Sequence, residues 1–414
     1  MEYIETLGAA AKSAAVYAAS LKAAEKNAVL AEIAARLRAE TDTILAANAA
    51  DIENAKKNGM SAALIDRLTL TKERIFGIAD GVEKVISLPD PIGEVIGGGE
   101  LPNGLRLVKR RVPIGVIGII FESRPNVTVD AAVLCFKAGN AVILRGGSDA
   151  INSNKALTEL MRSALEAKGA DKNCIQLVED TSRDVANAMM KLNTYIDLLI
   201  PRGGGGLIRA VINNATIPVI QTGEGNCHVY VDESADVDMA VNIVNNAKTQ
   251  RPSVCNAIEN ILVHEKIAPV FFEKLNALWN GKVTIVGDSA TAELIPVEKL
   301  ADDSDYATEF LDYKLSSKVV KDIDEAIAHI NRFGTKHSEC IVTSSLKNAE
   351  HFQQMVDAAA VYVNASTRFT DGFEFGLGAE IGISTQKLHA RGPMGLEALT
   401  TYKYLINGDG QIRG

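Results

Sequence analysis

Apolar residues recur at helical spacing in the first part of the chain and then give way to shorter, strand-like runs. The helical repeat ends at Gly59 and is carried by Val29, Leu30, Ile33 and Leu37. Residues 92–112 instead contain two short β-like runs on either side of the turn-forming Pro102, Asn103 and Gly104. The pattern therefore predicts N-terminal helices followed by a hairpin.

Between residues 114 and 231, short apolar runs alternate with helical segments, one of which covers 154–168 and ends before Gly169. This alternation is typical of a parallel sheet whose strands are joined by helices. The predicted strands are 114–121, 141–144, 175–178, 198–200 and 218–221.

A second α/β series begins near Asn226, where the order of the motifs places a domain boundary. We predict helices at 237–249 and 323–332 and strands at 257–263, 340–343 and 361–364. The chain ends with another alternating run, 401–406, followed by turn-like residues. An exposed hairpin at 92–112 and this last strand are both suited to pairing with another subunit, so we expect a homo-oligomer.

Composition and charge narrow the classes of function. The 414 residues are 47% hydrophobic and 23% charged, with a formal net charge of -9, which does not favour binding to nucleic acid or an anionic membrane. The apolar stretch 112–121 is too short to span a bilayer, and the alanine-rich N-terminus lacks the cationic segment of a signal peptide. Five cysteines without a CxxC pair indicate a reducing compartment and no zinc-ribbon metal site. We therefore expect a cytoplasmic protein that acts on a small molecule.

Two glycine-rich turns follow predicted strands. The first comprises Gly203, Gly204 and Gly205, and the second comprises Arg145, Gly146, Gly147 and Ser148. The first turn also precedes a helix, where unsubstituted backbone N–H groups and the helix dipole favour a phosphate. Two such turns favour one dinucleotide, and Arg145 with Ser148 would hold the ribose 2′-phosphate that distinguishes NADP from NAD. The alternatives are a flexible turn and a solvated arginine.

Cys255 differs from the other four cysteines in its surroundings. Those four have apolar neighbours in or beside predicted helices and strands, which is typical of structural buried thiols: Cys135, Cys174, Cys227 and Cys340. Cys255 lies in an irregular polar stretch between a helix and a strand, near Arg251, and a nearby cation favours the thiolate. A thiolate attacks carbonyl carbons readily, and the backbone N–H of the same residue helps to stabilise the resulting oxyanion. Because six histidines occur elsewhere in the chain, a Cys–His hydrolase is the alternative.

The order of these motifs resembles that of the aldehyde dehydrogenase superfamily and, within it, of the gamma-glutamyl phosphate reductases. The resemblance extends over essentially the whole chain and is carried by the segments 112–118, 121–127, 138–140, 144–148 and 326–341, with Cys255 at the position of the nucleophile. It implies an α/β fold of the aldehyde dehydrogenase type. A Rossmann-type parallel-sheet domain (1–226, with the hairpin 92–112) would bind NADP, and a second α/β domain (227–364) would be catalytic. Residues 365–414 would return to the cofactor domain and complete a small β oligomerisation element.

The resemblance also implies a reaction, namely the NADPH-dependent reduction of L-glutamyl 5-phosphate to L-glutamate 5-semialdehyde with release of phosphate, in proline biosynthesis. The glutamate kinase that makes the substrate is the implied partner. Aldehyde-oxidising relatives carry a glutamate that activates water, where this sequence has Thr222 with Glu224 close by. A thioester that hydride must attack is better kept from water, so Thr222 suits a reductase. Glu224 in that place would instead suit a hydrolytic aldehyde dehydrogenase, and a non-catalytic dinucleotide-binding scaffold is a further alternative.

Several site residues follow from the resemblance. The oxyanion formed at Cys255 would be held by its own N–H and by a side chain of the turn that contains Ser123 and Asn126. Glu309 would hold the nicotinamide ribose. The anionic groups of the substrate are assigned to Arg124, Asn126, Arg251 and Ser253. Residues 363–370 would add further substrate contacts, and His337 is expected to be structural.

Overall fold

The computed structural model describes residues 2–413, and the chain divides into two compact units, which are described separately. Unit 1 runs to Gln221 and also contains Leu377–Gly382 and the residues from Met394 onward; unit 2 comprises Thr222–Gly376 and Ile383–Pro393. The predicted domain boundaries lie after Asn226 and before residue 365. Residues 1 and 414, the ends of the predicted domains, lie outside the described part of the chain. Residues 365–376 and 383–393 belong with unit 2.

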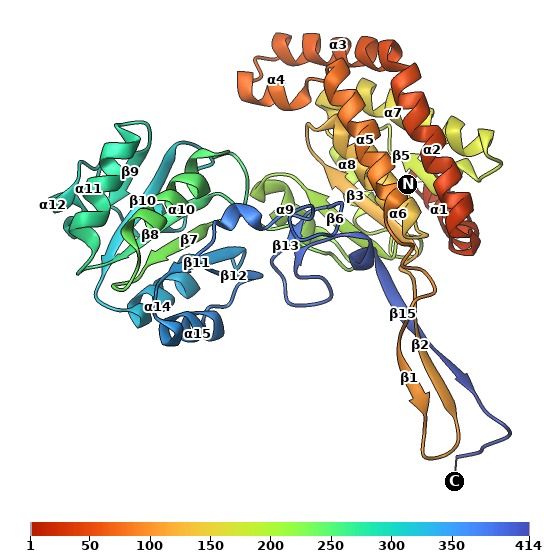
Figure 1. Cartoon of the computed structure of the whole chain (residues 1–414). Coiled ribbons are helices and arrows are strands. Elements are labelled where there is room, and N and C mark those ends of the chain that lie inside the picture. Colours follow the sequence, from red (N-terminus) through yellow and green to blue (C-terminus); the bar gives the residue numbers. More distant parts are fainter. Residues whose placement is uncertain (1, 414) are drawn as a thin grey trace. The chain divides into compact units, whose positions relative to one another are not determined.

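Unit 1 begins with five helices (Figure 1). They are α1 (Glu2–Ser20), α2 (Ala23–Ala39), α3 (Thr41–Lys57), α4 (Ala62–Leu68) and α5 (Lys72–Ser87). In α5 the buried residues are spaced by three or four positions, namely Ile75, Ile78, Ala79, Val82 and Val85. This is the spacing of one helix face, so the core contact follows directly from the sequence pattern. Gly59, at φ 72°, lies just beyond α3, where the predicted helical segment stops.

The sheet of unit 1 is parallel, with the strand order β5-β4-β3-β6. Its strands are β3 (Val116–Phe121), β4 (Ala141–Arg145), β5 (Ile175–Leu177) and β6 (Leu198–Arg202), and the helices are α6 (Pro125–Lys137), α7 (Ile151–Ala167), α8 (Arg183–Met189) and α9 (Gly205–Asn214). The predicted parallel sheet is confirmed, but the predicted strand 218–221 is wrong. Only an isolated bridge joins Val219 to Leu199. Pro218 has no N–H to donate, and by Thr222 the chain already pairs with Ser384 instead.

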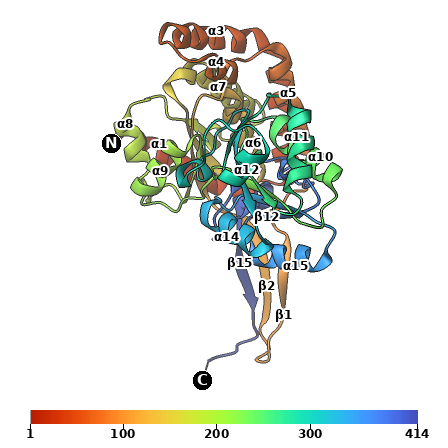
Figure 2. The same cartoon turned by 90° about the vertical axis from the view of Figure 1, so that its left-hand side faces the viewer.

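A three-stranded antiparallel sheet projects from the rest of unit 1 in both views (Figures 1 and 2). It consists of β1 (Val95–Glu100), β2 (Arg106–Pro113) and β15 (Thr400–Asn407), in the order β1-β2-β15. The predicted hairpin and the predicted C-terminal strand therefore lie in one sheet. The exposed side chains of Tyr402, Tyr404 and Ile406 lie on its edge strand β15.

The sheet of unit 2 has six parallel strands in the order β12-β11-β7-β8-β10-β9. They are β7 (Cys227–Val231), β8 (Ile258–His264), β9 (Thr284–Gly287), β10 (Lys314–Val320), β11 (Ser338–Val342) and β12 (Ala360–Val363). Helices cover both faces: α10 (Val237–Thr249), α11 (Ala268–Trp279), α12 (Ser289–Leu294), α13 (Asp303–Tyr306), α14 (Ile323–Phe333) and α15 (Leu346–Met355). Alternate residues of β7 enter two different apolar clusters, with Val229 in one and Tyr230 in the other. The predicted strands of this series did not include β7, β9 or β10.

The remaining short elements are β13 (Ile383–Ser384) and β14 (Gly392–Pro393), which pair in unit 2, and four 3₁₀ turns. The 3₁₀ turns are Ser148–Ala150, Lys172–Cys174, Thr367–Phe369 and Leu396–Leu399. Within residues 2–413, no helix has the length and apolar character required to cross a bilayer.

Candidate active site

Cys255 lies in a turn between α10 and β8 and is half-buried, whereas the other four cysteines are fully buried. Burial raises the pKa of the Cys174 thiol and of the Cys340 thiol to about 12, and it raises the pKa of the Cys135 and Cys227 thiols as well. A thiol whose thiolate is disfavoured is a poor nucleophile. The structure therefore leaves Cys255 as the cysteine that a substrate can reach.

The backbone of Cys255 is fixed by Cys227, the first residue of β7, and by Gly225 just before it. The Cys227 thiol donates to the Cys255 carbonyl oxygen at 3.2 Å. Gly225 packs so tightly on the same carbonyl group that a Cβ on this glycine would overlap with the oxygen. Cys255, the predicted nucleophile, thus lies on a turn whose backbone is held at this carbonyl group, although the turn is outside regular secondary structure.

The cationic side chain of Arg368 acts on the Cys255 thiol. Arg368 is half-buried and interacts electrostatically with Cys255, with Arg251 and with Asp371; burial lowers the pKa of its guanidinium. Its Nε donates to Gln250 Oε1 at 2.7 Å. Arg251 is exposed and Ser253 is half-buried, as groups that meet a soluble substrate must be. An ionised Arg368 favours the thiolate form of Cys255 and offers an anionic substrate a binding partner.

The segment 363–370, which carries Arg368, is tied to the Cys255 turn by hydrogen bonds from both sides. Asn256 Nδ2 donates to the Thr370 carbonyl at 2.9 Å, and Thr367 Oγ1 donates to the Asn256 carbonyl at 2.7 Å. The sequence identified this run as a source of substrate contacts but did not single out Arg368. The signal that could have identified Arg368 is a basic residue in a polar stretch that follows a strand.

Iodoacetamide is expected to label native protein at Cys255 much faster than at the four other cysteines, because those thiols are buried and their pKa values are raised. Peptide mass mapping after a short exposure checks this, and denatured protein, in which all five cysteines react, is the control. Labelling of Cys174 or Cys340 at the rate of Cys255 would show that Cys255 is not distinctive.

Glu309 lies in the same unit as Cys255 and is held by the same glycine. Its Oε1 accepts a hydrogen bond from Gly225 N at 2.7 Å, and burial raises the pKa of its carboxyl group. Glu224 is half-buried and its charge also acts on Glu309. Thr222 is buried and bridges to Ser384, and its hydroxyl is not a base that could activate water.

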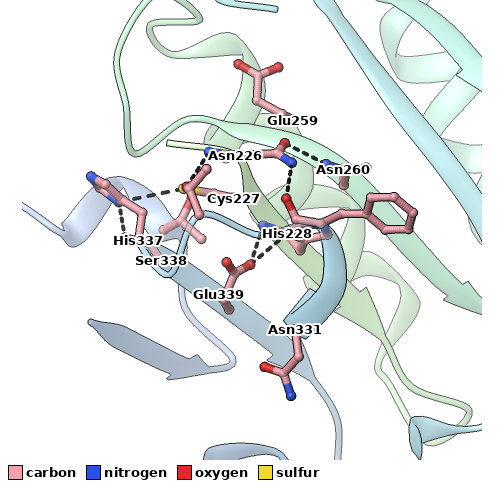
Figure 3. Close-up of polar contacts among 12 residues, drawn as sticks. Asn226, Cys227, His228, Glu259, Asn260, Asn331, His337, Ser338 and Glu339 are labelled. Atoms are coloured by element: carbon pink, nitrogen blue, oxygen red, sulfur yellow. Dashed lines mark hydrogen bonds and ion pairs between the residues drawn. The ribbon is translucent and has the colours of Figure 1, made fainter. Parts of the chain in front are cut away.

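His337 belongs to a buried polar cluster with Ser338, Cys227, His228 and Glu339 (Figure 3). Its Nδ1 lies 2.8 Å from Ser338 Oγ and 3.7 Å from Cys227 Sγ, and burial lowers its pKa to about 4. Next to it, His228 Nδ1 lies 3.0 Å from Glu339 Oε2, and burial lowers the pKa of His228 to about 3 while raising that of Glu339. These imidazoles are neutral near pH 7, which suits a packing role.

The first glycine turn of unit 1 forms the start of α9, with Gly204 as its N-cap. The Glu122 carboxylate accepts a hydrogen bond from Gly204 N at 2.8 Å, and a Cβ on Gly203 would lie 2.5 Å from Glu122 Oε2. A Cβ on Gly206, by contrast, would meet open space. The helix start therefore binds an anionic group already, and its open side has room for a cofactor phosphate. These features fit a dinucleotide.

The second glycine turn follows β4. Arg145 Nη2 donates to the Thr181 carbonyl at 2.7 Å, while its buried Nε has no hydrogen-bond partner among the described residues. Gly146 and Gly147 have no room for side chains, because a Cβ would collide with Asn154 and Asp149 respectively. Ser148 begins the 3₁₀ turn after them. The unpartnered Nε gives Arg145 a donor to offer a ligand.

The predicted substrate and oxyanion residues of the 123–126 turn also lie in unit 1. Ser123 Oγ donates to the Asp149 carboxylate, and Asn126 Nδ2 donates to Asp130 Oδ2 at 3.0 Å. Arg124 is exposed and precedes α6. Since the Ser123 hydroxyl has only one hydrogen, which Asp149 takes, Asn126 with its second amide hydrogen is the better donor of the two.

Comparison with known proteins adds independent findings. Residues 2–295 match the aldehyde dehydrogenase family. The chain is 57% identical over 415 residues to the gamma-glutamyl phosphate reductase of Carboxydothermus hydrogenoformans, covering 100% of both chains. It resembles the crystal structure of the Thermotoga maritima gamma-glutamyl phosphate reductase with 48% identity and a TM-score of 0.96, covering 99% of each. An acetylating aldehyde dehydrogenase of Geobacillus thermoglucosidasius shares the fold at 18% identity and a TM-score of 0.71, with 100% of this chain and 98% of that chain covered.

Proposed function

Because this chain belongs to the aldehyde dehydrogenase family, and within it to the gamma-glutamyl phosphate reductases, we propose that it reduces L-glutamyl 5-phosphate to L-glutamate 5-semialdehyde and releases phosphate. This is a step of proline biosynthesis. The observation that carries the proposal is the half-buried Cys255, whose carbonyl group is held by Gly225 and Cys227, in a chain that matches such reductases along its whole length.

The Cys255 thiolate attacks the acyl carbon of the substrate, with Arg368 favouring its ionised form. The oxyanion accepts hydrogen bonds from the Cys255 N–H and from Asn126. The bond from the acyl carbon to the phosphate oxygen then breaks, phosphate leaves, and a thioester remains on Cys255. The hydride that reduces this thioester would come from a nicotinamide cofactor when one is bound. The thiohemiacetal collapses to the aldehyde and returns the thiol. Arg124, Arg251 and Ser253 meet the anionic groups of the substrate.

The family uses NAD or NADP, and we assign NADPH to this chain. The support for NADPH is Arg145, whose buried Nε has no hydrogen-bond partner among the described residues, together with the Ser148 hydroxyl beside it. Gly203, Gly204 and Gly205 would hold the diphosphate at the start of α9, and Glu309 would hold the nicotinamide ribose. No metal is needed for this chemistry.

Glu122→Gln is expected to tighten NADPH binding by about two- to five-fold, the range that corresponds to one carboxylate at a helix N-terminus. The reason is that the Glu122 carboxylate, which accepts a hydrogen bond from Gly204 N, places a negative charge at this helix start and repels a phosphate there, whereas the glutamine amide is uncharged. The dissociation constant is measured by NADPH fluorescence. Glu159→Gln removes an equal charge from the exposed face of α7 and serves as the control. Weaker binding in the Glu122 variant would make Glu122 a direct cofactor ligand instead.

The competing reaction is hydrolytic aldehyde oxidation, for which Glu224 would have to activate water. Phosphate dependence separates the two reactions. With the semialdehyde and NADP but no phosphate, a phosphorolytic enzyme is expected to form about one NADPH per active site and then stop, since its thioester awaits phosphate. Adding phosphate should start steady turnover. Steady turnover without phosphate would establish the hydrolytic reaction.

Three further assignments complete the proposal. The exposed aromatic residues on the edge strand β15 support a homo-oligomer formed through the β1-β2-β15 sheet. A glutamate kinase would supply the short-lived acyl phosphate. The cytoplasm is the proposed compartment, supported by five cysteines that form no disulfide within the described residues.

A further inference from the structure

A buried ion pair lies behind the segment that carries Glu309. Lys248 Nζ of α10 and Glu259 Oε2 of β8 are 2.6 Å apart, and both side chains are fully shielded from solvent. Buried pairs of this kind contribute little to stability on balance, because removing two charges from water costs about as much as their attraction returns. The pair is therefore not explained by stability alone, and its contact with a neighbouring segment suggests a role in positioning.

The second oxygen of Glu259 makes that contact. Glu259 Oε1 accepts a hydrogen bond from the Leu311 N–H at 3.2 Å. Leu311 has a φ of 57°, in the left-handed region that a leucine adopts only when its surroundings impose it. Lys248 orients the carboxylate, and the carboxylate holds the backbone two residues beyond Glu309.

The other end of the Glu309 segment is held as firmly. The Tyr306 carbonyl accepts hydrogen bonds from Asn226 Nδ2 at 2.7 Å and from Asn260 Nδ2 at 3.2 Å. These two asparagines are themselves joined at 2.7 Å (Figure 3). Glu309 thus lies between two anchored points, and its own carboxylate rests on Gly225 N.

We propose that Glu259, oriented by Lys248, is a positioning residue that fixes Glu309 for the nicotinamide ribose through the Leu311 N–H. Glu259 touches neither substrate nor cofactor. It sets the affinity for the cofactor without affecting the reactivity of Cys255. This inference rests on the proposed role of Glu309.

A matched pair of double variants isolates the Leu311 contact. Lys248→Met/Glu259→Gln removes the buried charges but keeps a carbonyl oxygen that can accept from Leu311 N–H. Lys248→Met/Glu259→Leu removes the charges and the acceptor together. Both are expected to fold, because apolar or neutral groups of similar volume replace a buried ion pair without large cost. Thermal unfolding checks this before any binding is measured.

The dissociation constant for NADPH, measured by fluorescence without substrate, is expected to rise roughly ten-fold in the Glu259→Leu double variant and to change little in the Glu259→Gln one. The rate of Cys255 alkylation and the KM for the semialdehyde should match the wild type in both. Equal NADPH affinity in the two variants, or slower alkylation in either, would overturn the inference. A wild type that binds NADPH but does not show phosphate-dependent turnover would refute the proposed reaction instead, while leaving the binding comparison valid.

Discussion

Cys255→Ser is expected to lower turnover by about a thousand-fold or more while leaving NADPH binding unchanged. A serine hydroxyl keeps the size of the side chain but is not ionised near neutral pH, so the first bond of the reaction cannot form at a useful rate. The variant should fold normally, because Cys255 is half-buried and serine keeps the backbone carbonyl group that Cys227 and Gly225 contact. Initial rates of semialdehyde oxidation with phosphate and NADP measure the effect.

Cys340→Ser is the matched control, since it removes a buried thiol from β11 of the same unit. Its turnover per folded molecule should match that of the wild type. Undiminished activity in the Cys255 variant would exclude the covalent mechanism. A wild-type protein that binds NADPH but has no reductase activity would favour a non-catalytic dinucleotide-binding scaffold.

Gly225→Ala is expected to be the most damaging single-methyl change in unit 2. The new Cβ would overlap with the Cys255 carbonyl oxygen and crowd the carbon atoms beside it. The backbone must move to relieve this overlap, which typically costs about 1–3 kcal/mol or more of unfolding free energy. Any such movement displaces Cys255 and also the Gly225 N–H that donates to Glu309. We expect lower stability in urea unfolding and a loss of turnover that exceeds the loss of folded protein.

Gly77→Ala is the control for this experiment. Gly77 lies in α5, where a Cβ would meet nothing within 4 Å, so alanine should raise stability slightly through its better helix propensity. A Gly225 variant with wild-type turnover would show that the Cys255 turn is less constrained than its contacts indicate.

Local periodicity was sufficient to predict much of the fold. The alternation of apolar runs and helices gave the parallel strands of unit 1, and α10 was predicted with the bounds that the structure shows. The strands β9 and β10 were not predicted, because β9 is short and β10, Lys314–Val320, includes the buried Ser316, whose hydroxyl bonds to the neighbouring strand β8. Such polar strand residues are stabilised by contacts with residues far away in the sequence, and these contacts leave no trace in the local hydrophobic pattern.

The site divides in the same way. Cys255 was predicted from its own neighbourhood, since a polar turn between a helix and a strand is visible in sequence. The contacts of Gly225 and Cys227 with its carbonyl group join segments far apart along the chain. The same is true of Arg368, which the fold brings to the thiol, and of Glu259, whose neighbours in sequence do not indicate that it supports Leu311. Only the folded chain reveals residues that act through another residue.

The acyl-enzyme itself provides the most direct test of the account. Protein incubated with the semialdehyde and NADP in the absence of phosphate is quenched in acid, digested and examined by mass spectrometry. We predict a glutamyl group in thioester linkage on the peptide that contains Cys255, which disappears when phosphate is added before the quench. An unmodified Cys255 peptide from enzyme that has formed NADPH, or a glutamyl group on another residue, would contradict a covalent mechanism through Cys255.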